Sequence, residues 1–426
     1  MAQRSHGSNP VKFYRVGGSV RDELLGRAVV DRDWVVTGAT PEMLIASGYR
    51  PVGRDFPVFL HPETREEYAL ARTERKHGRG YRGFEFFVSP DVTLEEDLAR
   101  RDLTINAMAR DADGALIDPF GGEADLRVGV LRHVSPAFAE DPLRVLRVAR
   151  FAARFGFPVA PQTATLMRKL VASGELAELA PERVWQELSR GLMEPRPSRM
   201  LAVLRDCGAL AQLLPEVDAQ YGRRRRGPAH PRGDRPAHVA VALEHAAARA
   251  FPLPVRYAIL VHDLAGAPSP RAGPSRHPRH ALDSVRLAEQ ASLRLKAPAD
   301  CREAARLAAR WHAWVARAPE LPPAKLLDLV TAADALRRPE RLDALLDTCE
   351  CLALSRSPCT GEYPPARIVR EALGVVRSVD AGAVARRVSA KAGTGAAGHA
   401  DAVGKAVRAA RLKALRDWRR AKARLP

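Results

Sequence analysis

Two aspartates near the N-terminus, Asp31 and Asp33, are separated by a single residue and lie among apolar residues. Residues two apart on a β-strand face the same way, so we expect these carboxylates to project together. A pair of carboxylates on one face can hold two Mg²⁺ ions about 3.5–4 Å apart, the arrangement used for in-line phosphoryl transfer. The sequence therefore predicts a magnesium site that acts on a phosphate.

An apolar run before these aspartates ends at Gly17 and Gly18 and predicts a strand, a glycine turn and a helix starting at Ser19. Paired glycines let backbone amides approach a phosphate, and the positive end of the helix favours the same anion. A bare Gly-Gly is more often only a turn, and a bare Asp-x-Asp is more often a solvated loop. The two together, in the order strand, turn, helix, acidic strand, are more specific.

Further chemistry-bearing residues follow along the N-terminal third. Glu67 lies in an expected strand and is either a third carboxylate that acts on the attacking hydroxyl or a solvated, salt-bridged glutamate. Residues 72–87 are basic and glycine-rich, which predicts a mobile loop near phosphates. A capping box at Thr93 to Glu96 predicts a helix that delivers Arg101.

The segment from Glu140 to Phe155 predicts an amphipathic helix whose arginines gather on one arc opposite the apolar face. As a structural alternative, Asp141 caps the helix, a proline occupies its first turn and the arginines form a solvated face. Residues from 161 onward alternate short amphipathic helices with Pro or Gly punctuation.

These motifs carry a resemblance to a known family. The pattern Gly-Gly-x-x-Arg-Asp followed by Asp-x-Asp-Trp resembles nucleotidyltransferases similar to DNA polymerase β, in the class II branch that includes CCA-adding tRNA nucleotidyltransferases and poly(A) polymerases. The resemblance implies an α+β fold. A polymerase-β-like head with a mixed sheet and helices would be followed by an all-α neck, body and HD-type helical domain.

The resemblance also assigns roles. Asp31 and Asp33 would hold Mg²⁺, Arg101 would reach the triphosphate, and the basic loop would take part in the switch from CTP to ATP. In the Glu-Asp-x-x-Arg motif, the aspartate and arginine would pair with the amino group and ring acceptor shared by C and A. The implied nucleotide-binding residues are Gly18, Arg21, Arg101, Asp141, Arg144, Arg147 and Arg150.

The C-terminal half contains an ordered set of metal-ligand residue types. His238 is followed by the pair His262-Asp263 and by Asp334, a pattern that resembles the HD phosphohydrolase superfamily. Imidazole and carboxylate ligands suit Ni²⁺, Mn²⁺, Co²⁺ or Mg²⁺. The lysine that often follows the His-Asp pair is absent here, so the metal site is better supported than phosphatase or 2′,3′-cyclic phosphodiesterase turnover. Three further histidines lie between these motifs and could line the site: His277, His280 and His312.

Composition limits the partners and the compartment. The 426 residues include 68 Lys+Arg against 50 Asp+Glu, a net charge of +18, which favours a polyanionic partner such as RNA. The five cysteines fit a reducing cytoplasm, and we interpret them as structural thiols rather than a metal knuckle. The first residues lack the apolar core of a signal peptide, and no apolar run is long enough to span a membrane.

We expect several domains in the order of the chain. The expected segments are a flexible N-terminus (1–12), the head (13–138), a helical neck and body that binds template and tRNA (139–220), a basic linker (221–236), an HD-like metal domain (237–350) and a helical basic tail (351–426) that either touches RNA or is solvated.

The leading interpretation is addition of CCA to tRNA 3′ ends from CTP and ATP. The alternatives are a poly(A) polymerase, a partial CC- or A-adding enzyme, or an HD metal phosphohydrolase whose head binds RNA. The sequence leaves the oligomeric state, monomer or homodimer, open.

Overall fold

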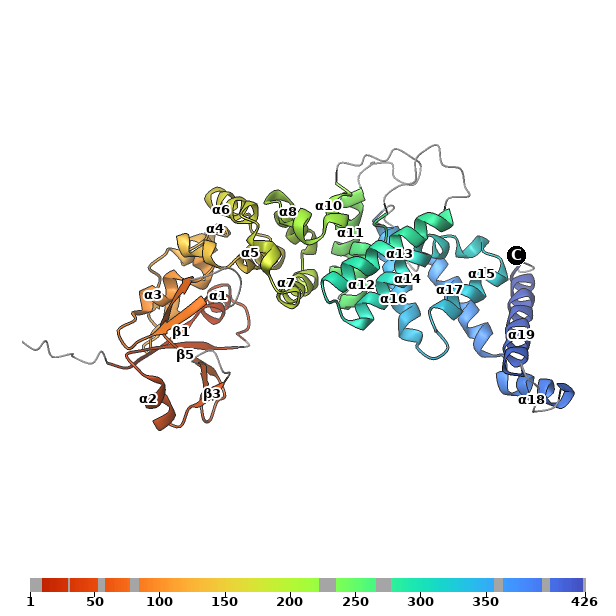
Figure 1. Cartoon of the computed structure of the whole chain (residues 1–426), viewed down its shortest axis with the longest axis horizontal. Coiled ribbons are helices and arrows are strands. Elements are labelled where there is room, and N and C mark those ends of the chain that lie inside the picture. The colour runs from red at the N-terminus through yellow and green to blue at the C-terminus, as the bar shows by residue number, and fades with distance from the viewer. Residues whose placement is uncertain are drawn as a thin grey trace, which may run out of the picture. The chain divides into compact units, whose positions relative to one another are not determined.

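The chain folds into two compact units, Met1–Pro215 and Glu216–Pro426, seen here in a computed structural model (Figure 1). The structure describes residues 10–29, 31–52, 58–76, 84–221, 235–265, 277–355, 363–392 and 399–423. Several predictions fall outside these residues: most of the flexible N-terminus, the tip of the basic loop, nearly all of the basic linker and Cys359.

The N-terminal unit contains a seven-stranded mixed sheet in the order β3-β4-β5-β2-β1-β8-β9. Strand β2 pairs in parallel with β5, whereas every other pairing within this sheet is antiparallel. The strands are β1 (Lys12–Val16), β2 (Asp33–Thr37), β3 (Arg50–Val52), β4 (Val58–Leu60), β5 (Glu67–Leu70), β8 (Ala109–Arg110) and β9 (Leu116–Ile117).

Successive side chains along the central strands point to opposite faces of this sheet. On one face Val16 and Val35 pack with Leu98 of α3 (Leu94–Ala99). On the other face Val36 and Leu70 pack with residues that include Leu44 of α2 (Pro41–Ala46). Because side chains alternate along a strand, Asp33 of β2 lies on the same face as Val35.

The segment expected to be a mobile basic loop is partly a β-ribbon. Strands β6 (Arg72–Lys76) and β7 (Phe84–Val88) pair antiparallel, with Arg72 opposite Val88. The prediction was wrong for these strands because the backbone hydrogen bonds of the ladder offset the poor core-forming composition. Residues 77–83 lie outside the described part of the chain.

Helices lie between the strands of this unit and form the rest of it after β9. The predicted capping box is present: the Thr93 hydroxyl accepts from the Glu96 amide, and the Glu96 carboxylate accepts from the Thr93 amide. The remaining elements of this unit are α1 (Gly18–Leu24), 3₁₀ helix η2 (Thr104–Asn106), α4 (Gly122–Val128), η3 (Pro136–Glu140), α5 (Leu143–Phe155), α6 (Pro161–Ala172), η4 (Glu175–Glu178), α7 (Pro181–Met193), α8 (Pro197–Asp206), α9 (Ala209–Leu213) and the start of α10 (Pro215–Asp218).

The described part of the C-terminal unit is helical (Figure 1), and its helices enclose a large apolar core. The last helix packs on this core through Leu412, Leu415 and Trp418, so the expected basic tail contributes to the fold of its unit. The helices are α11 (Arg235–Ala248), α12 (Leu253–Val261), α13 (His277–Arg294), α14 (Ala299–Val315), η6 (Ala318–Glu320), α15 (Pro323–Ala332), α16 (Pro339–Leu354), α17 (Pro364–Arg377), α18 (Ala381–Ala392) and α19 (His399–Lys422).

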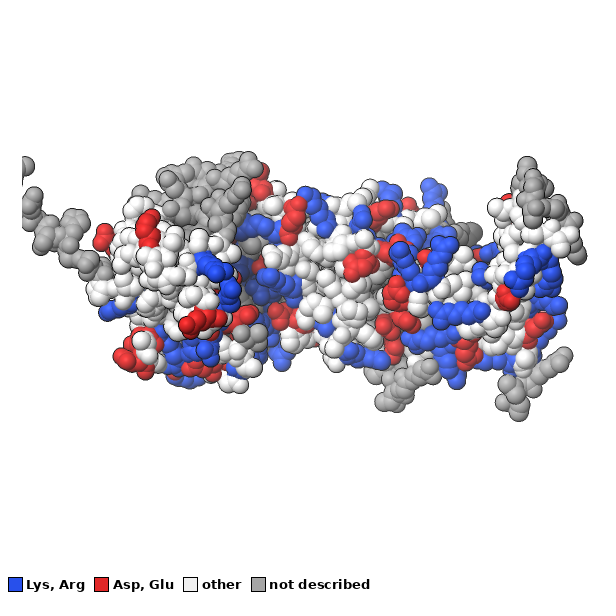
Figure 2. Space-filling model, turned by 90° about the horizontal axis from the view of Figure 1, so that it is seen from below, with Lys and Arg blue, Asp and Glu red and all other residues white. Residues whose placement is uncertain are grey.

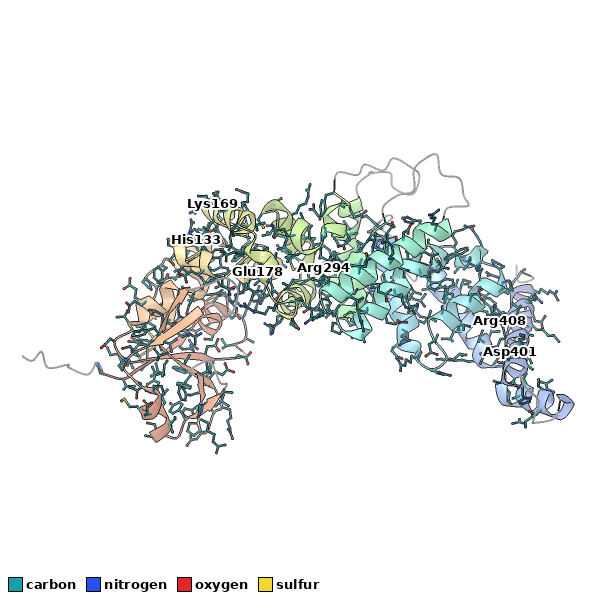
Figure 3. All side chains as sticks on the ribbon, in the orientation of Figure 1. His133, Lys169, Glu178, Arg294, Asp401 and Arg408 are labelled. Atoms are coloured by element: carbon teal, nitrogen blue, oxygen red, sulfur yellow. The ribbon has the colours of Figure 1, made fainter. Side chains whose placement is uncertain are left out.

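Charges on the C-terminal unit are mixed rather than segregated. Figure 2 shows basic side chains interspersed with acidic ones over the face in view. On α19, for example, Lys405 pairs with Asp401 at 2.7 Å, and Arg408 pairs with Asp328 at 2.7 Å (Figure 3). Surface pairs of this kind contribute little to stability, so they leave the choice of a solvated or an RNA-contacting tail open.

The described cysteines Cys207, Cys301, Cys349 and Cys351 are buried and carry thiols rather than disulfides. Burial raises the pKa of Cys301 and that of Cys351 to about 12. Thiols of this kind are inert, as the interpretation of structural cysteines requires. Among the described helices none has the length and apolar character that crossing a membrane requires.

Candidate active sites

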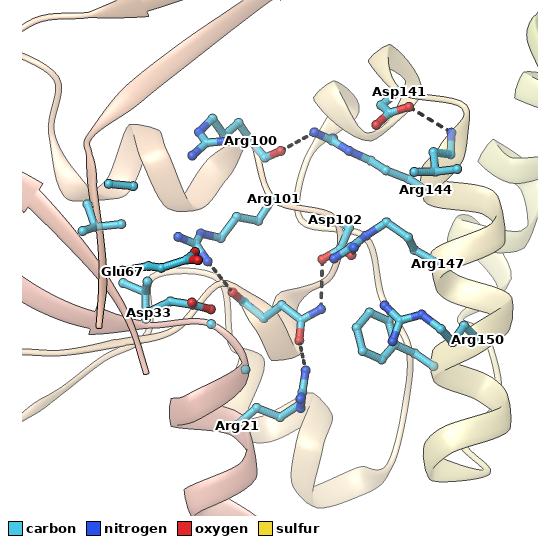
Figure 4. Close-up of a pocket in the computed structure, with 18 of the residues that line it drawn as sticks. Arg21, Asp33, Glu67, Arg100, Arg101, Asp102, Asp141, Arg144, Arg147 and Arg150 are labelled. Carbon is cyan, nitrogen blue, oxygen red and sulfur yellow. Dashed lines mark hydrogen bonds and ion pairs between the residues drawn. The ribbon is translucent and has the colours of Figure 1, made fainter. Parts of the chain in front are cut away.

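A pocket in the N-terminal unit lies against the face of the sheet that carries Asp33 (Figure 4). It gathers nearly all of the residues predicted from the nucleotidyltransferase motifs. The residues that line it include Gly17, Gly18, Arg21, Asp33, Glu67, Arg100, Arg101, Asp102, Asn106, Asp141, Arg144, Arg147, Arg150, Phe151, Arg154 and Arg183. Asp31, although described, is not among the lining residues.

In the glycine turn, Gly17 is the residue whose backbone and missing side chain matter for the pocket. Gly17 has a φ of +69°, which is left-handed backbone that glycine adopts without strain. A Cβ at this position would lie 2.9 Å from Nη1 of Arg101, so the absence of a side chain also lets that guanidinium approach. Helix α1 then begins at Gly18, one residue earlier than expected.

Two carboxylates are placed side by side by strand register. Asp33 is the direct parallel partner of Glu67, and neighbouring strands lie about 4.8 Å apart. Figure 4 shows both side chains pointing into the pocket that Arg101 also lines. Surrounding protein atoms and the nearby Asp31 raise the pKa of Asp33, and Arg101 opposes them. Bringing a cation to this group would relieve the carboxylate crowding.

Asp31 is placed differently from the prediction. Strand β2 begins at Asp33, so Asp31 precedes the strand and is exposed. The rule that residues two apart face the same way applies within a strand and does not fix this side chain. Asp31 is nevertheless close enough to raise the pKa of Asp33.

A buried carboxylate positions the two arginines that follow α3. Asp97 accepts from Arg100 at 2.6 Å and from Arg101 at 3.1 Å. Burial by itself would raise the pKa of Asp97, but the two guanidinium groups outweigh it and hold that pKa below its usual value. Arg101 is therefore oriented before any ligand arrives.

Asp102 is the second buried anchor. It accepts from Arg147 at 2.7 Å, from the Asn106 amide at 2.9 Å and from the Leu103 backbone at 2.8 Å. Burial opposes its ionisation, yet Arg147 and these hydrogen bonds hold its pKa well below the usual range. Asn106 also accepts from Arg21, so one chain of polar contacts joins α1, η2 and α5.

The predicted arginine stripe of α5 is present, but its members already have partners. Arg144 donates to the carbonyl oxygens of Ala137 at 2.7 Å and Arg100 at 2.6 Å. Arg150 pairs with the buried Glu187 at 2.6 Å, and Arg154 pairs with Asp22 at 2.9 Å. The solvated-face alternative is therefore wrong for Arg144 and Arg150, whose exposed fractions are 6% and 8%.

Asp141 is shared between the helix start and a neighbouring arginine. Its carboxylate accepts from the Leu143 amide at 3.0 Å and pairs with Arg183 of α7 at 3.1 Å. Both parts of the expected base-pairing motif, Asp141 and Arg144, are thus engaged within the protein and line the pocket.

Sequence reasoning missed the acidic anchors of this network, Asp97, Asp102 and Glu187, together with Arg183. A signal was available for two of them. Asp97 precedes the two arginines by one helical turn, and Glu187 lies beside Leu188 on the buried face of α7. An acidic residue on an apolar helix face indicates a buried partner, since unpaired buried charges are rare.

A second candidate site lies in the C-terminal unit. The potential ligand atoms of His262, Asp263 and His312 all lie within 4.8 Å of one another. The ring centroids of His262 and His312 are 4.9 Å apart, and those of His238 and His262 are 6.2 Å apart. Burial, with His312 close by, lowers the pKa of His262 well below its usual value, which keeps the ring neutral.

The structure changes the membership of this site. His312, considered only as a lining residue, belongs to the group of ligand atoms, whereas the expected ligands His238 and Asp334 do not. Asp334 lies in the turn after α15. The ring N–H of His280 donates to the Asp263 carboxylate at 2.7 Å, and His238 contacts Ser355. The side chain of His277 lies outside the described residues.

Comparisons with known proteins agree with this geometry. Residues 13–132 match the Poly A polymerase head domain, and residues 156–221 match a probable RNA and SrmB-binding site of polymerase A. The Multifunctional CCA protein of Azoarcus sp. (strain BH72) is 56% identical over 411 residues, covering 95% of this chain and 98% of that protein. The chain belongs to the multifunctional CCA protein family.

Other relatives extend the comparison. The family member from Nitrosomonas europaea is 56% identical over 381 residues, which cover 89% of this chain and 92% of that protein. The crystal structure of Bacillus stearothermophilus CCA-adding enzyme in complex with CTP matches with a TM-score of 0.64 at 24% identity, covering 98% of this chain and 95% of that one. At that identity the structural match shows the fold.

Family membership confirms three predictions. The fold class is a nucleotidyltransferase head followed by helical domains, the resemblance to class II enzymes is correct, and the chain is a CCA tRNA nucleotidyltransferase. The names of these multifunctional CCA relatives favour CCA addition over the poly(A) polymerase alternative.

Proposed function

We propose that the pocket of the N-terminal unit transfers nucleotides from CTP and ATP to the 3′ end of tRNA, in the order C, C, A, with Mg²⁺ bound by Asp33 and Asp31. The parallel register that places Asp33 beside Glu67, facing Arg101, carries this proposal. These oxygen donors are the ligands that Mg²⁺ prefers. Bound Mg²⁺ would supply charge neutralisation on the triphosphate and activation of the attacking hydroxyl.

Different residues of the pocket act on the attacking hydroxyl and on the phosphates. Glu67 faces the attacking 3′ hydroxyl, whose oxygen forms a bond to the α-phosphorus as the bond to the leaving pyrophosphate breaks. Arg101, held by Asp97, and Arg21, held by Asn106, are aimed at the phosphates, together with the amide of Gly18. Because the acidic anchors orient these guanidinium groups in advance, little reorganisation is needed during the reaction.

Base selection is assigned to Asp141 and Arg144, which line the same pocket. Asp141 accepts from the amino group common to C and A, and Arg144 donates to a ring acceptor. In the structure Arg144 is bonded to two backbone carbonyls and Asp141 to Arg183, so recognition of a base exchanges these contacts for contacts with the nucleotide. Arg147 and Arg150, fixed by Asp102 and Glu187, border the nucleotide.

The test is incorporation of labelled CTP and ATP onto tRNAs ending before CCA, after C and after CC. Addition of the missing nucleotides and no more is expected from the intact protein, and none from Asp33→Ala. The control is Glu63→Ala, which removes an exposed glutamate near β5. A long A-tail would contradict the proposal and support a poly(A) polymerase.

We propose a second, hydrolytic function for the C-terminal unit, carried by the grouping of His262, Asp263 and His312. Two imidazoles and a carboxylate suit Ni²⁺, Mn²⁺, Co²⁺ or Mg²⁺. The expected substrates are phosphate monoesters or 2′,3′-cyclic phosphates of RNA ends. Phosphate release from the monoesters and ring opening of the cyclic phosphates to monoesters, each measured with each metal and compared with His262→Ala, test this function. Release that persists in the variant would refute it.

Both activities act on RNA ends in the reducing cytoplasm, which fits the free, buried cysteines.

A further inference from the structure

An aromatic and cationic cluster extends from the pocket along the end of α5. The ring of Phe155, the last residue of this helix, has three guanidinium groups around it. The guanidinium carbons of Arg27, Arg21 and Arg154 lie 5.0, 5.1 and 5.3 Å from its centroid. Arginines within about 6 Å of a ring make favourable cation–π contacts.

The three arginines differ in their surroundings. Arg21 is 3% exposed and paired with Asp22, and Arg154 is also paired with Asp22. Arg27 is exposed and, within the described part of the chain, forms no ion pair. A charged side chain that packs on a ring and leaves its remaining surface to solvent is available to a ligand.

Local backbone geometry places Arg27 close to Asp31 in sequence and close to the pocket of the N-terminal unit in space. Helix α1 ends at Leu24, and Gly26, with a φ of +63°, turns the chain before Arg27. Asp31 follows four residues later. Arg21 and Arg154 contact the same ring as Arg27 and also line the pocket, so the cluster adjoins the nucleotide site.

We propose that Arg27, backed by Phe155, is a stacking platform for an unpaired base at the 3′ end of the RNA primer. A planar guanidinium stacks on a nucleobase, and an aromatic ring behind it fixes its plane. Stacking tolerates any base, as needed at a primer end whose last nucleotide changes during addition. The platform rests on the proposed nucleotidyl transfer and adds to it the means of holding the acceptor strand.

The test uses binding rather than turnover. A tRNA minihelix ending in CC is labelled at its 5′ end, and its dissociation constant is measured by fluorescence anisotropy without nucleotide. Arg27→Ala is expected to weaken binding roughly tenfold, within the range for loss of one base stack. Arg27→Lys keeps the charge without the plane and is expected to recover only part of the loss. Arg50→Ala, which removes an exposed arginine from β3, is the matched control for charge.

Minihelices with an abasic nucleotide at each unpaired 3′ position identify the stacked base. At the position that stacks, the abasic RNA is expected to bind the intact protein and Arg27→Ala equally. The proposal would be overturned if Arg27→Ala weakened the binding of all RNAs equally, or if Arg27→Lys bound RNA as tightly as the intact protein. Either result would mean that Arg27 contacts only a phosphate. Phe155→Leu gives a second variant, expected to weaken binding of the intact RNA more than of the abasic one.

Failure of the platform is distinguishable from failure of the proposed function. If the intact protein extends tRNA by CCA but Arg27 variants bind every RNA normally, only the platform is wrong. If the intact protein incorporates no nucleotide, the proposed function fails whatever the binding results.

Discussion

The head pocket and the histidine cluster of the C-terminal unit place reactive side chains by different means. In the head, β-strand register sets Asp33 beside Glu67, and buried carboxylates hold the arginines around them. In the C-terminal unit, His262 and Asp263 follow the end of α12, and His312 comes from α14. Register fixes neighbours within one sheet, whereas the helical site depends on how separate helices pack. In both sites a short motif indicates some of the residues, Asp33 in the head and His262-Asp263 in the C-terminal unit, but not the partners that come from other elements.

The sharpest test of this comparison is a crossed pair of variants. Asp33→Ala should lower nucleotide incorporation by about a thousandfold or more, since a ligand of the catalytic metal is lost, and leave phosphate release unchanged. His262→Ala should do the reverse. Both activities are measured on the same preparations. Loss of both in either variant would show that the two sites are not independent.

The next largest effect concerns the buried anchor of the head. Asp102→Asn should destabilise the N-terminal unit by about 3 kcal/mol, because Arg147 would lose its buried counter-charge. Thermal unfolding followed by circular dichroism measures this. The pairing depresses the pKa of Asp102, so its stabilisation is complete above the unfolded pKa of about 4 and is lost as the pH falls below it.

Asp102→Asn should therefore show a weaker loss of stability between about pH 4 and pH 2 than the unaltered protein. An identical acid dependence of the two proteins would mean that the Asp102–Arg147 pair is not the source of this stabilisation.

A smaller effect is expected at the histidine cluster. His312→Ala should weaken binding of Ni²⁺ or Mn²⁺ by about ten- to a hundredfold, because one of three grouped ligands is removed. Isothermal titration calorimetry measures the affinity. Asp334→Ala is the matched comparison and should bind the metal nearly normally. The opposite ranking would restore Asp334 to the ligand set expected from sequence.

The smallest effect concerns the contacts of Trp34, the residue that follows Asp33 on β2. The Trp34 indole donates to Glu66 at 2.9 Å, and the Trp34 ring stacks on Tyr68. Glu66→Gln keeps an acceptor but loses the charge, and should cost about 1 kcal/mol of stability. Urea unfolding followed by tryptophan fluorescence checks this value. If Glu66→Gln lowered the free energy of unfolding more than Asp102→Asn, the contacts at the sheet would stabilise the head more than the contacts at α5.

Sequence reasoning was strongest where residues lie close together in the chain. The motif around Asp33, the capping box at Thr93 and the helix that carries Arg144 were all predicted from local patterns, and the family comparison confirms the fold class. The strand pattern failed at Asp31, because nothing in the sequence fixes where β2 begins. It also failed to foresee that residues 72–76 and 84–88 pair as a ribbon.

The sequence also did not predict contacts between residues that lie far apart in the chain. Glu187 meets Arg150 and Asp102 meets Arg147 because α7, η2 and α5 pack together, and no periodicity specifies which residues face one another. The grouping of His312 with His262 and Asp263, without the expected His238 and Asp334, has the same origin. A pattern of ligand types gives candidates, but helix packing selects among them.

The register between β2 and β5 also limits how this protein can change in length. Slipping one strand by a single residue turns its side chains to the opposite face of the sheet. A one-residue insertion within Asp33–Thr37 or Glu67–Leu70 would carry either Asp33 or Glu67 away from the pocket. The exposed turn at residues 62–65, by contrast, can absorb added residues without disturbing that alignment. Permissive sites for peptide tags in the head should therefore be sought in this turn.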